Sequence, residues 1–323
     1  MRAIPLLTLM LGGYLVTPAQ AATDASQWLD RLTQAEQKQS FQGTFVYERS
    51  GSFSTHDIWH RAQGGGITER LLQLDGSAQE VVRVNGRTTC VSGSLAAGVG
   101  VADIGERSDA GADTLDPLKL MSWYDLSVAG ESRVAGRKAV VIKLEPKDQY
   151  RYAFELHLDE ETGLVLKSLL LDERGHLLER LQYTRLQASA PAEIAVQATP
   201  NCKPVLRDVP VRADVAAVNW RSEWVPPGFE LKGASVRDST VGKVQVTSLA
   251  YADGLARFSV FMEPLKGSRG ADSRDQLGPT AAVSRRVNTG SGEVLVTVVG
   301  EIPIGTAERI ALSMRPQDAR TQR

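Results

Sequence analysis

Four histidines, at positions 56, 60, 157 and 176, are the side chains best suited to transfer protons near neutral pH. His56 and His60 have the i, i+4 spacing with which a helix presents two ligands to zinc. The residues around them alternate as a β-strand does, however, and four strand residues at about 3.3 Å each separate the imidazoles by roughly 13 Å. Zinc–nitrogen bonds of about 2 Å cannot bridge that gap. The sequence therefore predicts polar strand positions here and no metal site.

Other catalytic patterns are weaker still. The chain has no G-x-S-x-G elbow that would expose a nucleophilic serine. The acidic run Asp159–Glu161 precedes Thr162-Gly163, a position typical of solvated turn residues. After Gly98-x-Gly100, the third glycine of a dinucleotide-binding loop would fall on Asp103. We therefore expect no catalytic residues and no cofactor, and a hydrolase is the least favoured interpretation.

Composition describes a globular protein of two domains. The 323 residues are 42% hydrophobic, and each of two domains of ordinary size would bury its own core. The 37 basic and 38 acidic side chains give a formal net charge of -1. Because nucleic-acid binding depends on a basic stripe, this balance makes DNA or RNA an unlikely partner.

The amino terminus predicts export. Arg2 is followed by an uncharged apolar run from Ile4 to Val16, and Ala19-Gln20-Ala21 has the small-x-small pattern of a signal-peptidase site. A run of this length spans only about 20 Å as a helix, less than the roughly 30 Å of a bilayer core. We predict a signal peptide at residues 1–21 and a soluble exported protein.

Two cysteines are present, Cys90 and Cys202. In an exported chain an even pair is often bridged, which would cross-link two distant elements. Two separate buried thiols are the other interpretation, since sequence does not show how far apart the Cα atoms lie. Both interpretations stay open at this level.

The elements that would hold these residues are mostly strands. Ser26 is positioned to cap a short amphipathic helix, and from Phe41 the hydrophobic period changes to two. Strands are predicted at 45–47, 55–60, 71–74, 81–84, 88–91, 125–128, 139–144, 150–158, 164–171 and 177–183. Asn85-Gly86 is a strong two-residue hairpin signal. A meander of this size must curl to protect its edges, so we predict a mostly antiparallel α+β fold that begins with an unclosed half-barrel packed on a helix.

A second domain follows a proline-rich break. Residues 188–213 contain four prolines and little periodicity, so we place a linker there, between a first domain at 22–187 and a smaller α+β domain at 214–316, with a tail at 317–323. Strands are predicted at 245–251, 256–262 and 294–299, and a helix from about Thr306. The stretch 93–113 has neither period and is predicted to be a mobile loop.

Two groups of side chains are candidates for binding. Apolar strand residues could line the half-barrel and accept an acyl chain, although packing of the core explains them equally well. The lipid-binding candidates are Phe45, Tyr47, Trp59, Leu72, Leu74, Tyr152 and Phe154. In the second domain, any exposed aromatic or arginine is a candidate contact for a protein. The partner-binding candidates are Trp220, Trp224, Phe229, Arg257, Phe261, Arg285 and Arg286.

Long segments carry a family resemblance. The stretches 41–49, 54–61, 69–76, 130–137, 154–159, 220–229, 251–261 and 296–301 closely resemble the MucB/RseB family of sigma-E regulatory proteins, with the pseudomonad members as the nearest match. Nearly the whole chain after the leader is covered. The resemblance is weakest at 93–113 and 188–214.

The resemblance implies a periplasmic, non-enzymatic negative regulator of the envelope stress response of the sigma-E or AlgU type. Such proteins bind the periplasmic domain of a membrane anti-sigma factor of the RseA or MucA type and shield it from regulated proteolysis. Their first domain resembles the lipoprotein carriers LolA and LolB, and lipid or lipopolysaccharide is expected to release the partner. The protein would be soluble in the periplasm and peripheral to the inner membrane through its partner.

We expect the second domain to make the main partner contact, and a homo-oligomer stays open. A periplasmic lipid or lipoprotein carrier is the alternative function, because the same half-barrel would serve it.

Overall fold

The computed structural model describes residues 18–77, 79–93, 115–205, 211–212, 218–238, 244–265, 270–290 and 292–317. Most of the predicted signal peptide, nearly all of the predicted loop at 93–113, much of the 206–217 segment and the end of the predicted tail lie outside these residues. Within the described part of the chain, no helix has the length and hydropathy needed to cross a membrane.

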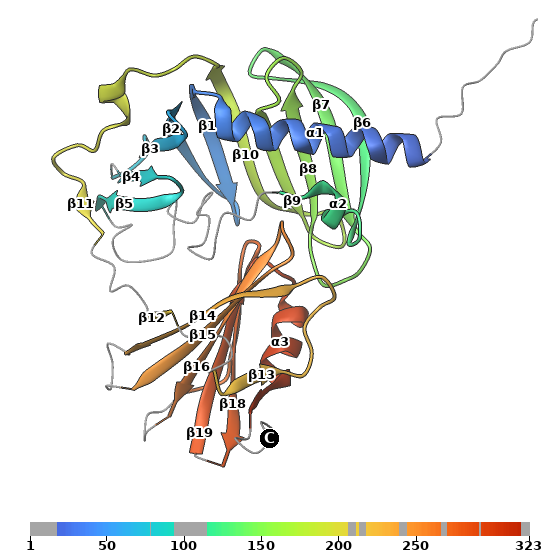
Figure 1. The fold of residues 1–323 in the computed structure, drawn as a ribbon, viewed down its shortest axis with the longest axis vertical. Helices are drawn as coiled ribbons and strands as arrows, with labels where there is room; N and C mark the ends of the chain where they lie inside the picture. The colour runs from blue at the N-terminus through green and yellow to red at the C-terminus, as the bar shows by residue number, and fades with distance from the viewer. Residues whose placement is uncertain are drawn as a thin grey trace, which may run out of the picture.

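The first domain is built on one curled antiparallel sheet of eleven strands (Figure 1). Along the sheet the order is β11-β5-β4-β3-β2-β1-β10-β9-β8-β7-β6. The strands are β1 (Phe41–Arg49), β2 (Ser52–Gln63), β3 (Gly66–Gln73), β4 (Gln79–Val84), β5 (Arg87–Val91), β6 (Tyr124–Val134), β7 (Arg137–Pro146), β8 (Ala153–Asp159), β9 (Val165–Leu171), β10 (Leu177–Gln187) and β11 (Lys203–Pro204). Two meanders, β1 to β5 and β6 to β10, join where β1 pairs with β10.

The turns follow the local sequence. Asn85 and Gly86 both adopt positive φ, at 52° and 77°, as a type I′ hairpin requires. Ala135 and Gly136 do the same between β6 and β7. The predicted Asn85-Gly86 turn is confirmed.

Helix α1 (Pro18–Lys38) lies across the inner face of the sheet (Figure 1). Its buried stripe is Ala25, Leu29, Leu32 and Ala35, which packs on the apolar side of β6 to β8 and β1. The prediction of a helix starting at Ser26 was eight residues too late. Pro18 suits a first helical turn, and the alanines that follow it have the highest helix propensity.

The second domain is a seven-stranded antiparallel sheet with one helix packed on it (Figure 1). Its order is β12-β14-β15-β16-β19-β18-β17, and a separate pair joins β13 to β20. The elements are β12 (Val211–Arg212), β13 (Trp220–Ser222), β14 (Glu230–Asp238), β15 (Gln245–Ala252), β16 (Arg257–Pro264), β17 (Ser273–Leu277), β18 (Thr280–Thr289), β19 (Gly292–Gly300), α3 (Ile304–Ser313) and β20 (Met314–Pro316). Helix α3 buries Ala307, Ile310 and Ala311 against β18 and β19, as its sequence pattern predicts. The mostly antiparallel α+β class is confirmed.

Residues 188–205 return to the first domain. The short helix η3 (Glu193–Val196) contacts β2 and β3, and β11 pairs with β5 to complete the sheet. Helix α2 (Pro117–Leu120), capped by the Asp116 carboxylate, leads into β6. Trp123, just after α2, lies against the second domain at Gly228.

Candidate functional site

The seven lipid-binding candidates do not share one face of the sheet. Phe45 is fully buried on the face that α1 covers, between Tyr183 and His56, with ring centroids 5.6 Å and 5.2 Å away. Tyr47 shares that face and donates a 2.7 Å hydrogen bond to the Glu179 carboxylate, whose pKa is raised by burial. Because this face is occupied by the protein's own side chains, Phe45 is a core residue.

Trp59 and Leu72 face the other way. Trp59 pairs with Gln42, an odd number of residues before Phe45 in β1, so its side chain points to the face opposite that of Phe45. The Arg70 guanidinium lies 4.8 Å from the centre of the Trp59 ring. Leu72 pairs with Asp57 on the same outer face. Successive strand residues point to opposite faces, so a group chosen by strand membership mixes the two. The expectation of one shared lining was wrong for these two residues.

The other three candidates are also dispersed. Leu74 is 48% exposed, just after β3. Phe154 packs on the cluster around Leu29 and Leu156, beneath α1. Tyr152 is buried at the junction of the two domains, where its hydroxyl donates to the Ile302 carbonyl at 3.1 Å.

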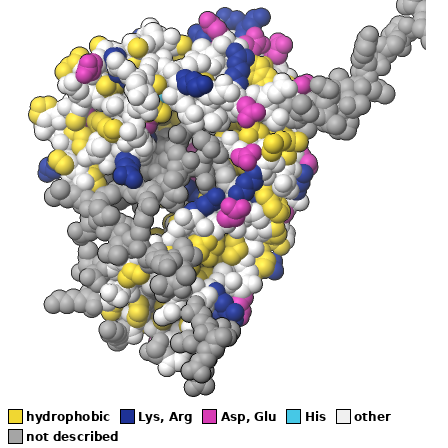
Figure 2. Space-filling model, in the orientation of Figure 1, with side chains coloured by type: hydrophobic (Ala, Val, Ile, Leu, Met, Phe, Trp, Pro, Cys, Tyr) yellow, Lys and Arg dark blue, Asp and Glu magenta, His cyan; other side chains and the backbone are white. Residues whose placement is uncertain are grey.

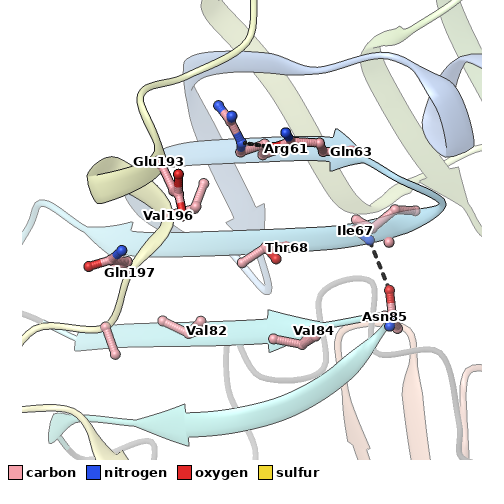
Figure 3. Close-up of a pocket in the computed structure, with 12 residues that line it drawn as sticks. Arg61, Gln63, Ile67, Thr68, Val82, Val84, Asn85, Glu193, Val196 and Gln197 are labelled. Atoms are coloured by element: carbon pink, nitrogen blue, oxygen red, sulfur yellow. Dashed lines mark hydrogen bonds between the residues drawn. The ribbon is translucent and has the colours of Figure 1, made fainter.

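A pocket of about 460 Å³ lies on the outer face, between β2 to β4 and the segment around η3 (Figure 3). Val82, Val84 and Val196 give it an apolar side, and Arg61 and Thr68 add polar groups. The Arg61 guanidinium donates to the Pro191 carbonyl at 2.6 Å and to Gln63 at 2.9 Å. None of the seven lipid-binding candidates lines this pocket. Its mixed lining suits a short apolar chain with an anionic or polar end.

The histidines do not assemble a reactive centre. His56 has no exposed surface, and burial lowers its pKa to about 4. His60 stacks on Phe41 at 4.6 Å and hydrogen-bonds Glu69 through Nδ1. Among the residues that the structure describes, no group of three or more His, Cys, Asp or Glu side chains is arranged to hold a metal ion.

Ser132, His157 and Glu155 form a hydrogen-bonded row with the residue types of a catalytic triad. The Ser132 hydroxyl lies 2.7 Å from Nδ1 of His157, and Nε2 of His157 lies 2.9 Å from the Glu155 carboxylate. A serine hydrolase uses the reverse order, with the serine on Nε2 and the carboxylate on Nδ1. This row satisfies the polar groups of the sheet surface and offers no site that the sequence analysis missed.

Cys90 and Cys202 form a disulfide, with Cα atoms 5.6 Å apart. A second anchor lies nearby, since Glu80 accepts hydrogen bonds from Arg70 and from Thr199. Burial of Glu80 raises its pKa, but these hydrogen bonds outweigh that effect and hold the pKa below its usual value. The segment that leaves the first domain is therefore fixed to β4 and β5 at two points.

The partner-binding candidates occupy several parts of the second domain. Trp220 and Trp224 are half-buried against the core, and Phe229 is buried in it. Phe261 lies near Arg237. Arg257 is half-buried, Arg285 pairs with Glu308 of α3, and Arg286 is exposed. Phe261 alternates along β16 with the buried residues Val260 and Met262, so its side chain faces away from the core and α3. Trp224 and Arg285 lie on the side of the sheet that α3 covers.

The junction between the domains collects the aromatic and basic side chains that sequence reasoning did not group. Tyr150 of the first domain meets Trp224 edge to face at 5.1 Å, and the Arg309 guanidinium covers Trp224 at 3.8 Å. Arg309 also donates to the Tyr150 hydroxyl at 3.1 Å. Figure 2 shows basic and acidic side chains where the domains meet, above an apolar patch on the second domain. Tyr, Trp and Arg are the residues that dominate protein-binding surfaces.

The arrangement defines a class: a two-domain binding protein, with an unclosed sheet around a helix joined to a smaller α+β module by a packed junction. The chain matches the family models described as MucB/RseB N-terminal domain, over residues 24–202, and MucB/RseB C-terminal domain, over residues 214–315. It belongs to the MucB/RseB family.

Named relatives agree over the full length. The chain is 56% identical to the sigma factor AlgU regulatory protein MucB of Pseudomonas aeruginosa, covering 97% of this chain and 98% of that one. It is 28% identical to the sigma-E factor regulatory protein RseB of Escherichia coli K12, with 96% of each chain covered.

Solved structures repeat the fold. The complex of P. aeruginosa MucA and MucB matches with a TM-score of 0.80 at 56% identity, covering 92% of this chain and 100% of that chain. A crystal structure of MucB without a named partner matches with a TM-score of 0.66 at 54% identity, covering 91% and 98%.

Proposed function

We propose that this protein binds the periplasmic domain of a membrane anti-sigma factor of the MucA type, and that it thereby keeps a stress sigma factor inactive. The observation that carries the proposal is the match across both domains to MucB solved in complex with MucA. The junction of Tyr150, Trp224 and Arg309 supplies side chains suited to grip a polypeptide.

The test uses residues 22–323 and the periplasmic domain of P. aeruginosa MucA as the probe. Calorimetry is expected to give a one-to-one complex, and Trp224→Ala is expected to weaken it at least tenfold because Trp224 is a partly buried aromatic side chain at the domain junction. Ile194→Ala is the matched control, since Ile194 is 72% exposed on η3, which packs on the outer face of the first domain. Failure of the wild-type protein to bind this probe would overturn the proposal.

Shielding from proteolysis is part of the same proposal. A bound segment is protected in proportion to the fraction that is bound, so adding the protein should slow cleavage of the probe by a periplasmic protease, with a midpoint near the measured Kd. Cleavage at an unchanged rate under saturating protein would contradict shielding while leaving binding intact.

Lipid or lipopolysaccharide is proposed as the releasing ligand. If lipid lowers the affinity for the MucA domain by some factor, the MucA domain must lower the affinity for lipid by the same factor. Titrating lipopolysaccharide micelles with and without the probe measures both factors, and unequal or absent effects would remove lipid from the proposal.

A lipid carrier is the second candidate, favoured by the mixed apolar and polar pocket of about 460 Å³ under η3. It predicts transfer of a fluorescent phospholipid from donor to acceptor vesicles, reduced by Val82→Asp within the pocket. Transfer with no effect of the protein on MucA cleavage would favour the carrier.

A further inference from the structure

Arg151 is buried at the junction of the two domains with no exposed side-chain surface. From its own domain, Asp148 accepts from the guanidinium at 3.0 Å. From the other domain, Asp253 accepts at 2.7 Å and the Pro227 carbonyl accepts a further hydrogen bond. The charge of Arg151 is thus satisfied by both domains together.

Asp253 depends equally on its contact with Arg151. Its side chain has no exposed surface, and its other carboxylate oxygen accepts from the backbone N–H groups of Leu255 and Ala256. Those bonds fix the carboxylate within the second domain and aim the remaining oxygen at Arg151. If the domains separate, each charge loses its main partner across the junction, and water must replace it.

Aromatic rings enclose the same guanidinium. Trp123 and Tyr124 of the first domain and Phe229 of the second lie 5.1 to 5.6 Å from it. The Trp123 indole lies against Gly228, where an added Cβ would come within 2.3 Å of the ring. Such a close fit allows one arrangement of the two surfaces and does not tolerate gradual sliding.

Two further contacts depend on the same arrangement. Lys119 pairs with Glu230 at 2.7 Å across the junction. The row of Tyr150, Trp224 and Arg309 also exists only when the domains meet in this way, because Tyr150 comes from one domain and the other two from the second.

At nearly equal identity, the TM-score over the aligned chain is 0.80 and 0.78 against two MucA-bound MucB structures and 0.66 against MucB without a named partner.

We propose that Arg151 is a positioning residue for partner binding. It latches the two domains, through Asp253 and Pro227, into the arrangement that completes the Tyr150–Trp224–Arg309 surface, and the anti-sigma segment binds that latched form. The proposal rests on the proposed function. The two domains are then in equilibrium between a latched and an open arrangement. The apparent Kd for the anti-sigma segment equals the intrinsic Kd of the latched form divided by the fraction of protein that is latched.

Two lysine–glutamate pairs of the native chain allow the contact between the domains to be measured by cross-linking. A carbodiimide joins a lysine amine to a carboxylate only when the two touch. A Lys119–Glu230 amide therefore reports the latched form, whereas a Lys232–Glu230 amide, from a pair 3.2 Å apart within the second domain, is an internal reference. The ratio of the two cross-linked peptides by mass spectrometry measures the latched fraction.

Three variants perturb the latch by different means. Arg151→Met removes the cation, Asp253→Asn removes the anion while keeping the shape, and Gly228→Ala places a Cβ against Trp123 at a backbone position whose φ of 88° itself disfavours alanine. Arg133→Met is the matched control, because Arg133 is exposed on β6. Circular dichroism melts confirm that both domains of each variant are folded, and the three separate routes keep the test valid if one variant unfolds.

The expected result is a cross-link ratio at least fivefold lower in the latch variants, with the Kd for the P. aeruginosa MucA periplasmic domain raised by the same factor, and no change in Arg133→Met. A saturating MucA domain should restore the wild-type ratio. An unchanged ratio, or a lower ratio with an unchanged Kd, would overturn the latch. If the wild-type protein binds no MucA, the proposed function fails and the latch loses the partner-binding role assigned to it.

Discussion

Breaking the Cys90–Cys202 disulfide is expected to destabilise the first domain selectively. The bridge closes a loop of 112 residues and holds β11 against β5. For a loop of that length the chain-entropy model gives about 4.8 kcal/mol at 25 °C, and removal of native disulfides typically costs about 2 to 5 kcal/mol. Because the loop lies within the first domain, the second domain should unfold as before.

The measurement is urea unfolding of the wild-type protein and of Cys90→Ser/Cys202→Ser. Tryptophan fluorescence reports on both domains, through Trp28, Trp59 and Trp123 of the first and Trp220 and Trp224 of the second, and the two transitions are fitted separately. We expect the midpoint of the first domain to fall by about 1 to 2.5 M, from a loss of about 2 to 5 kcal/mol and a slope of about 2 kcal/mol per molar urea.

A reducing agent added to the wild-type protein should reproduce the change, and the double variant should not respond to it. A loss below about 1 kcal/mol, or an equal loss in both domains, would refute the reasoning that the bridge acts by restricting the unfolded first domain.

Three further outcomes are expected. Phe45→Ala should cost about 3 to 5 kcal/mol because Phe45 is 1% exposed, whereas Phe53→Ala, at 64% exposure, should cost less than about 0.5 kcal/mol by chemical unfolding. Burial lowers the pKa of His56 to about 4, so the folded state binds fewer protons than the unfolded state below about pH 6.5. The free energy of unfolding of the wild-type protein should therefore fall by about 2 kcal/mol from pH 7 to pH 5. An equal loss in a His56→Asn variant would contradict the assignment of this pH dependence to His56. Glu80→Gln weakens the bonds from Arg70 and Thr199 and should speed hydrogen exchange of the Thr199 backbone N–H at least fivefold, and exchange as slow as in the wild type would show that the disulfide alone holds this segment.

Much of the local structure was predictable. Asn85-Gly86 needs positive φ at both positions, and the structure has it. Helix α3 followed from the spacing of Ala307, Ile310 and Ala311. Strand β18, by contrast, was missed because Arg285 and Arg286 interrupt its apolar alternation; Arg285 is accommodated by its ion pair with Glu308 of α3.

The candidate binding residues were less predictable. Trp59 and Phe45 both lie in strands, yet only the register of β1 and β2 shows that they face opposite sides of the sheet. Arg151 carried no signal, since its main partner Asp253 is 102 residues away and no sequence pattern links the two residues. Pairing across such a distance is decided by the packing of whole domains.

The amino-acid order alone determined most elements of the first domain, the Asn85-Gly86 turn, helix α3 and the family, because hydrophobic period, glycine turns and helix propensity act over a few neighbouring residues. Only the tertiary structure decided which face each strand residue occupies, that Cys90 meets Cys202, and that Arg151 is buried between two domains. The disulfide and the burial of Arg151 depend on contacts between residues more than a hundred positions apart, where local preference has no influence and the burial of charge and apolar surface selects the partner.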